Sequence, residues 1–202
     1  MTALEDLLDQ ERLPVPEDGY RVERVDDGRA LLSYDVDDRT RVAVIAHEDI
    51  TDFNDDTGWG VEVWASCDPA ELGVDLAEEL GFQIWTDAAG RPVPTSDVTS
   101  YPGAEHCDWQ DLTWLELGAA TDNDREVDTY VGGDDDGELA DFLSSTSDDS
   151  ATLPAGATDT GWRRDGRELW LGEHPRAAYL VSVEDRADVQ RWPAVTERIG
   201  CA

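Results

Sequence analysis

The chain has 202 residues, of which 40% are hydrophobic and eight are Trp, as in a globular protein with a sizeable core. Its 48 acidic residues face 15 basic residues, all of them Arg, which gives a formal net charge of −33. The complete lack of Lys excludes Schiff-base, P-loop and protein-kinase chemistry, and the negative charge argues against binding to nucleic acid.

The charge is unevenly distributed along the chain. Residues 1–67 carry a net charge of −12, residues 68–150 of −20 and residues 151–202 of −1. We therefore expect the near-neutral tail to pack against the acidic middle, or else to form a small separate module. The acidity itself has two interpretations: a solvated surface suited to high salt, or an anionic face for a cationic protein partner, including mimicry of a nucleic acid.

The chain begins without a recognisable targeting segment. The start, MTALEDLLDQE, lacks the basic and apolar regions of a signal peptide, and no run approaches the 18 apolar residues of a membrane span. The sequence therefore predicts a cytoplasmic protein without membrane insertion, or an exported one if a leader is missing from this chain.

Predicted elements begin with a short helix and a β-meander. Thr2 and Glu5 form a capping box for an N-terminal helix that ends at Leu13. Strand-like runs follow, and an Asp-Gly turn between the first two indicates a hairpin. These runs cover residues 20–25, 30–36, 40–47 and 59–65.

A well-capped helix is predicted over residues 69–80. Asp68 stands at its N-cap, Pro69 at its first position and Glu71 one turn on, and Gly81 follows its last apolar residue. Further strands are expected over residues 82–86, 98–101 and 110–117, and a short helix over 138–143.

The sequence pattern of the C-terminal part predicts a three-stranded meander. A second Asp-Gly turn, Asp165-Gly166, lies in the run 162–172, and the runs 177–183 and 189–192 complete the meander. Together these elements predict a single α+β domain over 1–202, mainly an antiparallel sheet with one well-capped helix. Its parts would be an acidic body at 15–143, a polar loop or linker at 144–160 and a near-neutral, Arg-rich β-meander at 161–202.

Three cysteines allow one disulfide and leave one thiol over. Cys67, Cys107 and Cys201 would all be reduced in a cytoplasm, whereas an exported chain would form one bridge. The spacing leaves both Cys107–Cys201 and Cys67–Cys107 open. Cys67 directly precedes a predicted helix N-terminus, which would stabilise its thiolate.

Metal or catalytic chemistry finds little support in the motifs. Cys67, His106 and Cys107 could supply nitrogen and sulfur ligands or a Cys–His dyad, but adjacent residues of a strand point to opposite faces. The acidic cluster of Asp122, Asp124 and Asp128 does not match a calcium loop. No metalloprotease, hydrolase-elbow or dinucleotide motif is present.

The tryptophans include two pairs spaced five residues apart. In regular strands, Trp59 and Trp64 would lie on opposite faces, as would Trp109 and Trp114. One member of each pair would then be buried and the other exposed or covered by a loop. An exposed Trp beside carboxylates would suit a carbohydrate or a cationic peptide.

Several segments together carry a resemblance over residues 59–202. The strings are WASCDPAE, QIWTDAAGRPVPT, EHCDW, DTGWRRDGRELWLG, AAYLV, RWP and the ending GCA. The chain resembles a group of hypothetical proteins from high-GC actinobacteria, some of which look like exported or envelope proteins. The resemblance implies an actinobacterial source and no particular activity.

These observations favour a non-catalytic binding or interaction protein without a cofactor, because the standard catalytic motifs are missing. One alternative is an acidic inhibitor, such as an immunity protein or nucleic-acid mimic, with a cationic partner. The other is an enzyme or metal protein centred on Cys67, His106 and Cys107. Cys201 joins these residues as a further candidate for a site or disulfide.

Overall fold

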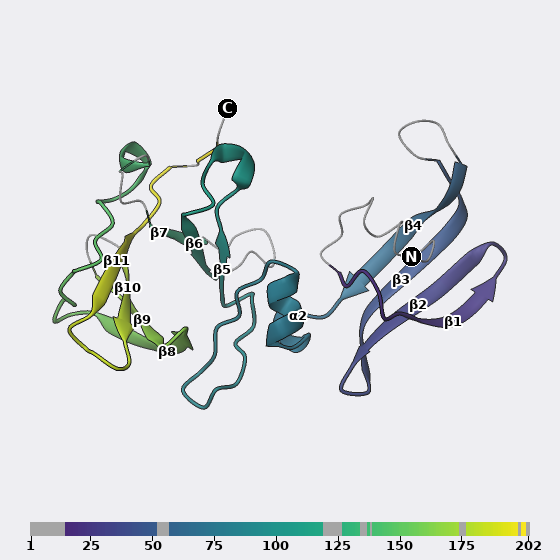
Figure 1. The fold of residues 1–202 in the computed structure, drawn as a ribbon, viewed down its shortest axis with the longest axis horizontal. Helices are drawn as coiled ribbons and strands as arrows, with labels where there is room; N and C mark the ends of the chain where they lie inside the picture. The colour runs from purple at the N-terminus through teal and green to yellow at the C-terminus, as the bar shows by residue number, and fades with distance from the viewer. Residues whose placement is uncertain are drawn as a thin grey trace. The chain divides into compact units, whose positions relative to one another are not determined.

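Antiparallel strands build most of the regular structure in the computed structural model of the chain (Figure 1). The structure describes residues 15–51, 57–118, 127–133, 137, 139–173, 177–197 and 199–200. The chain divides into two units, an N-terminal unit, Met1–Leu80, and a C-terminal unit, Gly81–Ala202. The single domain expected from the sequence stays a prediction.

The N-terminal unit is a four-stranded meander. Its strands hydrogen-bond in chain order and confirm the four runs predicted in this part of the sequence. The Asp27-Gly28 turn also forms as predicted, because both residues take the positive φ that a tight two-residue hairpin requires. The strands are β1 (Arg21–Asp26), β2 (Arg29–Val36), β3 (Arg39–Thr51) and β4 (Thr57–Ser66).

One face of this sheet carries the core of the N-terminal unit. Val42, Val44 and Ala46 alternate along β3 and are buried together with Leu32 of β2. Leu72, from the segment after β4, covers them. Burial of alternate side chains is the pattern of a sheet with one covered face.

The predicted helix over 69–80 is wrong as a continuous element. The chain forms a 3₁₀ turn, η1 (Pro69–Glu71), and then a separate α-helix, α2 (Val74–Glu79). Asp68 caps η1 as expected, because its side chain accepts a hydrogen bond from the Ala70 N–H at 2.9 Å. Gly73 then takes φ +90° and ψ 148°, a conformation outside the helical region, and this breaks the helix.

The C-terminal unit contains seven strands in two sheets among its described residues. The first sheet has the order β5-β6-β7 and the second β11-β10-β9-β8, all antiparallel. The bounds are β5 (Val98–Pro102), β6 (Thr113–Leu117), β7 (Asp128–Gly132), β8 (Thr158–Arg164), β9 (Arg167–Leu171), β10 (Ala177–Ser182) and β11 (Val189–Pro193).

Isolated antiparallel bridges close these two sheets into a small barrel. The extended residues 83–86 lie between β5 and β8, and the end of β11 lies beside β7. With residues 83–86 counted as a strand, the ring has an even number of members, as closure of an all-antiparallel barrel requires. The bridges are Gln83 with Ser100, Thr86 with Arg163, and Tyr130 with Ala194.

A single core cluster fills the barrel. It joins Trp85, Leu115, Leu169 and Leu180, which come from the 83–86 segment and from strands of both sheets. Two further clusters cover the outside: one lies over β10 and β11, and the other lies over β6 and β7. Residues 148–151, expected in a polar loop or linker, run along β11 with backbone hydrogen bonds to it.

The α+β fold class predicted from the sequence is therefore wrong. The described residues form three antiparallel sheets with one six-residue α-helix and three short 3₁₀ turns, including η2 (Glu105–Cys107) and η3 (Ala140–Phe142). The C-terminal meander has four strands, not three, because the Asp165-Gly166 turn separates β8 from β9. The predicted N-terminal helix lies outside the described residues.

Candidate functional site

One end of the barrel interior is polar. Alternate residues of each strand face inward, and those near the middle, such as Leu115 and Leu169, are completely buried. Toward one end the inward positions change from apolar to polar and surround a hollow of about 250 Å³. The polar and basic residues around it are Gln83, Ser100, Thr113, Arg164, Arg167 and Gln190.

Ser100 is the buried centre of this polar group. Its hydroxyl donates to Gln83 Oε1 at 2.8 Å and accepts from Trp85 Nε1 and from an Arg164 terminal nitrogen, both at 3.1 Å. A hydroxyl offers one donor and two acceptor sites, so these three bonds use all of them. Ser100, which is only 1% exposed, therefore positions its neighbours and is not poised as a nucleophile.

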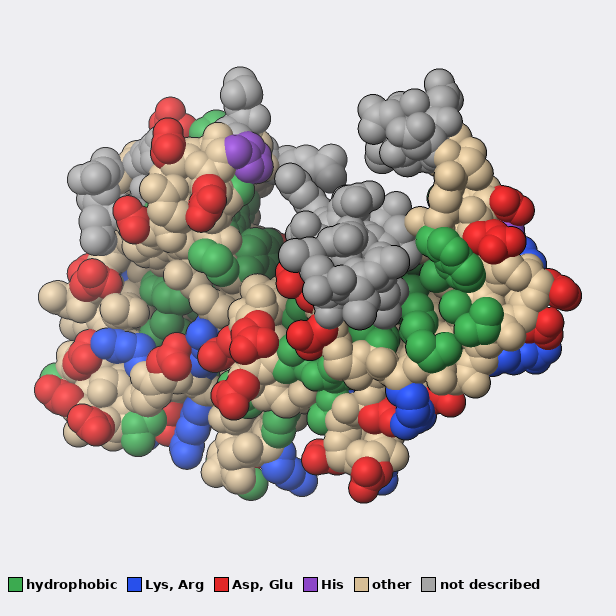
Figure 2. All heavy atoms as spheres, turned by 45° about the vertical axis from the view of Figure 1, so that its right-hand side comes forward, with side chains coloured by type: hydrophobic (Ala, Val, Ile, Leu, Met, Phe, Trp, Pro, Cys, Tyr) green, Lys and Arg blue, Asp and Glu red, His purple; other side chains and the backbone are tan. Residues whose placement is uncertain are grey.

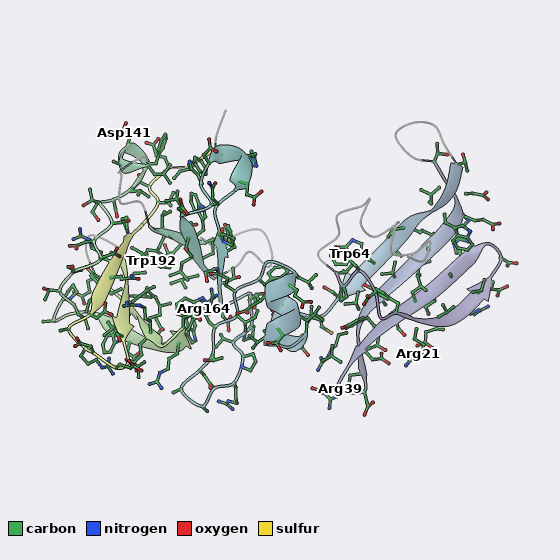
Figure 3. The ribbon with its side chains drawn as sticks, in the orientation of Figure 1. Arg21, Arg39, Trp64, Asp141, Arg164 and Trp192 are labelled. Atoms are coloured by element: carbon green, nitrogen blue, oxygen red, sulfur yellow. The ribbon has the colours of Figure 1, made fainter. Side chains whose placement is uncertain are left out.

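Two indole rings and a leucine supply the apolar part of the hollow. Trp85 is buried and Trp192 is partly buried, and Leu180 belongs to β10, the strand beside that of Trp192. Trp192 fits against β7 because Gly132 has no side chain: a Cβ there would lie 2.2 Å from Trp192 Cε2. Figure 3 labels Trp192 on β11 and Arg164 on β8, within the C-terminal unit.

Two arginines reach this hollow from a single hairpin. Arg164 ends β8, Arg167 begins β9, and the two residues are direct cross-strand partners on either side of the Asp165-Gly166 turn. Arg167 donates to the Leu180 carbonyl oxygen at 3.2 Å and to Asp188 at 2.9 Å. Arg164 contacts Asp165 at 3.2 Å in addition to Ser100.

The carboxylates that balance these arginines lie on the solvent side. The Arg164 side chain is 16% exposed against 77% for Asp165, and Arg167 is 24% exposed against 44% for Asp188. Water and salt screen an exposed carboxylate more strongly than a buried guanidinium. In both ion pairs the guanidinium group is therefore the more buried partner, on the side of the hollow.

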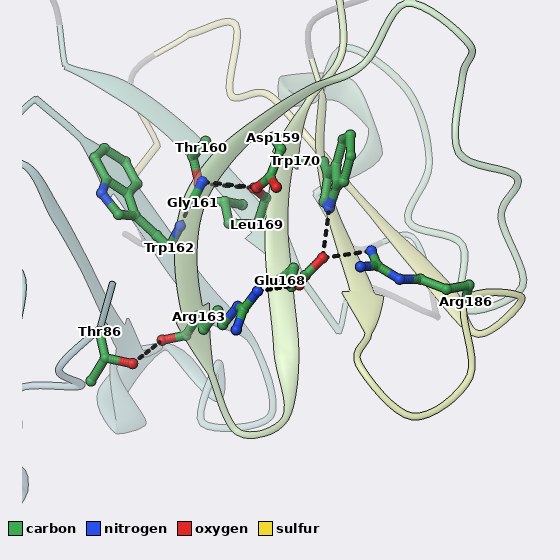
Figure 4. A network of polar contacts seen from close by, with 10 residues as sticks. All are labelled: Thr86, Asp159, Thr160, Gly161, Trp162, Arg163, Glu168, Leu169, Trp170 and Arg186. Atoms are coloured by element: carbon green, nitrogen blue, oxygen red, sulfur yellow. Dashed lines mark hydrogen bonds and ion pairs between the residues drawn. The ribbon is translucent and has the colours of Figure 1, made fainter. Parts of the chain in front are cut away.

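The outer side of the same hairpin carries a separate charged cluster, shown in Figure 4. Glu168 is only 3% exposed and pairs with Arg163 at 2.7 Å and with Arg186 at 2.5 Å. Trp170 Nε1 lies 3.4 Å from its second oxygen. This cluster anchors the turn containing Arg186 to β9, so its role is structural.

The N-terminal unit has a hollow of about 340 Å³ on its sheet. Leu31 and Ile45 form its base, and Arg24 and Arg29 form part of its rim. These arginines pair with exposed carboxylates, Arg24 with Asp26 and Arg29 with Glu62, and none of the lining residues is a buried polar group. It lacks the convergent polar groups that distinguish the barrel end.

The cysteine and histidine candidates do not form a site in the described residues. Cys67 is a free, partly buried thiol of the N-terminal unit, whereas Cys107 of the C-terminal unit is disulfide-bonded and has no thiolate to offer. His106 is exposed on η2. Cys201 lies outside the described residues.

Metal binding finds no support in the described part of the chain either. No three His, Cys, Asp or Glu side chains come together there in a way that could hold a metal ion. Of the acidic residues considered for calcium, Asp128 is the first residue of β7, and Asp122 and Asp124 lie outside the described residues. Nor does any helix of that part have the length and apolarity to cross a membrane.

The tryptophan prediction holds in part for one pair and fails for the other. Trp59 is 45% exposed while Trp64 packs against the core of the N-terminal unit, so their exposures differ as expected. The strand is not regular between them, however, because the β3–β4 register shifts between Ile45 and Ala46. Trp109 and Trp114, however, lie together in one cluster with ring centroids 6.0 Å apart. Trp109 precedes β6 instead of belonging to it, so strand alternation does not govern its direction.

Sequence patterns did not identify the polar end of the barrel. Its residues come from strands and an extended segment separated by up to about a hundred positions, and only ring closure brings them together. One local signal was available, because a two-residue turn flanked by Arg on both sides places two guanidinium groups side by side. Comparison of the chain with models of protein families, with curated proteins and with solved structures found no match.

Proposed function

We propose that this protein is a non-catalytic binding protein and that the polar end of its C-terminal barrel is the site for a small molecule. The observation that carries the proposal is the convergence on one hollow of a buried, fully bonded serine, two indole rings and two arginines. Mouths of β-barrels are common places for ligand sites, which combine apolar walls with a few fixed polar groups.

The size of the hollow limits the ligand. A volume of about 250 Å³ lies just below the range of about 300–1,000 Å³ that is typical of pockets for drug-sized ligands. The interior beyond it is filled by Leu115 and Leu169, which are completely buried, so a ligand cannot enter further. The site therefore suits a small organic molecule with a single ring or a short chain.

The chemistry of the lining favours binding over catalysis. The Ser100 proton points to an amide oxygen, and Asp165, the one carboxylate in the lining, is 77% exposed and paired with Arg164. A general base must reach the proton that it removes from a bound substrate. The lining places fixed hydrogen-bond donors around a small volume instead, which is the arrangement of a binding site.

The disulfide at Cys107 supports an oxidising compartment as the working location of the protein. Cys67 is free, so we expect a single reactive thiol per chain after denaturation without reductant, and three after reduction. Titration with a chromogenic disulfide reagent measures both numbers. Three thiols in the unreduced, denatured protein would support the cytoplasmic alternative.

Protein-observed NMR with a fragment library tests the proposed site. In ¹⁵N-labelled full-length protein, we expect some fragments to shift the indole signals of Trp85 and Trp192 together, because both rings line the hollow. Thr113→Trp should fill the hollow and abolish these shifts. Thr158→Trp, a matched change at an exposed position of β8, should preserve them.

Thermal unfolding of both variants separates loss of the site from loss of the fold. If Thr113→Trp unfolds cooperatively and still binds the fragments as the wild type does, the site lies elsewhere and the proposal is wrong. The proposal also fails if no member of a chemically broad library shifts either indole signal.

A further inference from the structure

We infer that the ligand of this barrel site carries a carboxylate, held between Arg164 and Arg167, on a small apolar body. The inference rests on the proposed function and adds the chemical class of the ligand. It is drawn from the placement of the two arginines, the positions of their counter-charges and the composition of the rest of the hollow.

The first observation is that the barrel places two like charges directly opposite each other. Arg164 and Arg167 are register partners across the β8–β9 hairpin, and both line the hollow. Cβ atoms of such partners are about 5 Å apart, and like charges in that arrangement destabilise a sheet. An anion bound between the two guanidinium groups would convert this repulsion into two attractive contacts.

The second observation concerns the counter-charges of the two arginines. Arg164 contacts Asp165 and Arg167 contacts Asp188, so each guanidinium group is paired with one carboxylate. The carboxylates of Asp165 and Asp188 are both more exposed than the arginines that they contact. With two carboxylates this close, a monoanion such as a carboxylate suits the site better than a doubly charged phosphate, which the neighbouring acids would repel more strongly.

The third observation concerns hydrogen-bond donors. Guanidinium groups present a fork of N–H donors that fits a carboxylate with two parallel hydrogen bonds. Within the described residues, Nε of Arg167 donates to no protein atom, while its terminal nitrogens are bound to Leu180 O and Asp188. Arg167 therefore still has a donor to offer, and its bonds to β10 and to Asp188 hold its orientation.

The fourth observation is the apolar part of the same hollow. Trp85, Leu180 and Trp192 form its wall, and the Trp85 N–H is already bound to Ser100. These surfaces offer dispersion and apolar burial to the rest of a ligand. The combination fits a small aromatic or branched aliphatic carboxylic acid.

Matched pairs of acids and amides provide the test. Benzoate and benzamide, and phenylacetate and phenylacetamide, have nearly the same shape and differ in charge. We expect the acids to shift the Trp192 indole signal at concentrations at least about tenfold lower than the amides, because a hydrogen bond to a charged group is worth more than a neutral one. Work at 0.15 M salt limits the influence of distant acids, since the Debye length is then about 8 Å.

Arg167→Gln is the decisive variant, with Arg39→Gln as its control. Both remove one positive charge from the chain, but Arg39 is an exposed residue at the start of β3 in the N-terminal unit. We expect Arg167→Gln to weaken benzoate binding at least about tenfold and to leave benzamide binding unchanged. Arg39→Gln should bind both compounds as the wild type does.

The outcomes separate this inference from the proposed function. Equal or tighter binding of the amides, or unchanged benzoate binding by a folded Arg167→Gln protein, would overturn the carboxylate assignment and leave the binding site standing. Tighter binding of phenyl phosphate than of benzoate would overturn it as well. If neither member of any pair, nor any compound of the broader library, shifts the two indole signals, both proposals fail together.

Discussion

Among single residues, Glu168 shows how this acidic protein uses its few cations. It is the one carboxylate of the described residues that is almost completely buried, and it lies between Arg163 and Arg186 (Figure 4). Burial of one charge without partners would cost several kcal/mol. The two arginines offset that cost and remain partly exposed, at 41% and 60%, so their own charges stay largely solvated.

Replacement of Glu168 by Gln should therefore destabilise the C-terminal unit. We expect a loss of about 1–3 kcal/mol, below the range for a fully buried pair, because both arginines can regain water. Urea unfolding followed by Trp fluorescence measures the change. Glu184→Gln, at an exposed position nearby, should change the stability by less than about 0.5 kcal/mol. Equal effects of the two substitutions would show that the Glu168 contacts contribute nothing.

Glu23 offers a residue-level test of acid sensitivity in the N-terminal unit. Hydrogen bonds from Arg21, and secondarily from Ser33, lower the pKa of the Glu23 carboxyl below its ordinary value. A lowered pKa in the folded state stabilises the fold above the unfolded value of about 4.3, and this stabilisation is lost as the pH falls through the folded value. Arg21→Gln should raise the Glu23 pKa toward 4.3.

An NMR titration of the side-chain carboxyl carbon of Glu23 measures this pKa in both proteins. The variant should also lose less stability than the wild type between pH 4.3 and pH 2, since Arg21 no longer favours the ionised form. Arg24→Gln also removes one positive charge from β1 and should leave the pKa of the Glu23 carboxyl as it is in the wild type. If Glu23 titrates identically in wild type and Arg21→Gln, the ion pair does not persist in solution.

At the scale of elements, local chemistry predicted the turns well and the helix badly. Both Asp-Gly hairpins form because the two turn residues alone determine the required backbone conformation. The Asp68 cap also forms as predicted. The break at Gly73 escaped prediction because glycine tolerates both helical and extended conformations, and the packing of Leu72 against the sheet decides between them.

Gly73→Ala distinguishes the observed break from the predicted continuous helix. With φ +90° and ψ 148° at this position, a Cβ is strained, and we expect a destabilisation of about 1–3 kcal/mol. In a continuous helix the same substitution would stabilise by about 1 kcal/mol, so the sign of the effect is decisive. Thermal or urea unfolding measures it, with Gly58→Ala as the control, because a Cβ at Gly58 meets no atom within 4 Å and its φ is ordinary.

For the whole molecule, the distribution of charge bears on the inhibitor alternative. Mimicry of a nucleic acid needs carboxylates aligned on one face. On the face seen in Figure 2, acidic side chains stand among arginine and apolar side chains. Ten arginines of the described residues pair with carboxylates, from Arg21 in β1 to Arg191 in β11. This interspersed pattern favours the interpretation of the acidity as a solvated surface.

The candidate site also belongs to this scale, which explains why periodicity did not predict it. Gln83, Ser100 and Arg164 are hydrogen-bonded around one serine hydroxyl, yet they lie on three different members of the ring. Strand patterns indicate which residues face inward, but not which strands become neighbours. Two of the contacts that close the ring near Ser100 are single bridges from residues 83–86. This segment is too short for its sequence pattern to indicate which strands it pairs with.

Salt dependence tests the solvated-surface interpretation. Between 0.1 M and 1 M NaCl the Debye length falls from about 10 Å to about 3 Å, which screens repulsion among the 33 uncompensated negative charges. The same salt weakens the surface ion pairs, but each of these is worth only about 0–1 kcal/mol. Repulsion therefore dominates, and we expect the Tm to rise by several degrees, since 1 kcal/mol corresponds to about 2–4 °C for a chain of this size.

Two other salts provide the controls. Choline chloride at equal ionic strength should raise the Tm equally if screening is the cause, whereas a rise at millimolar CaCl₂ alone would reveal a specific cation site. A Tm that falls with NaCl would mean that the arginine ion pairs outweigh the repulsion and that the acidity serves another purpose.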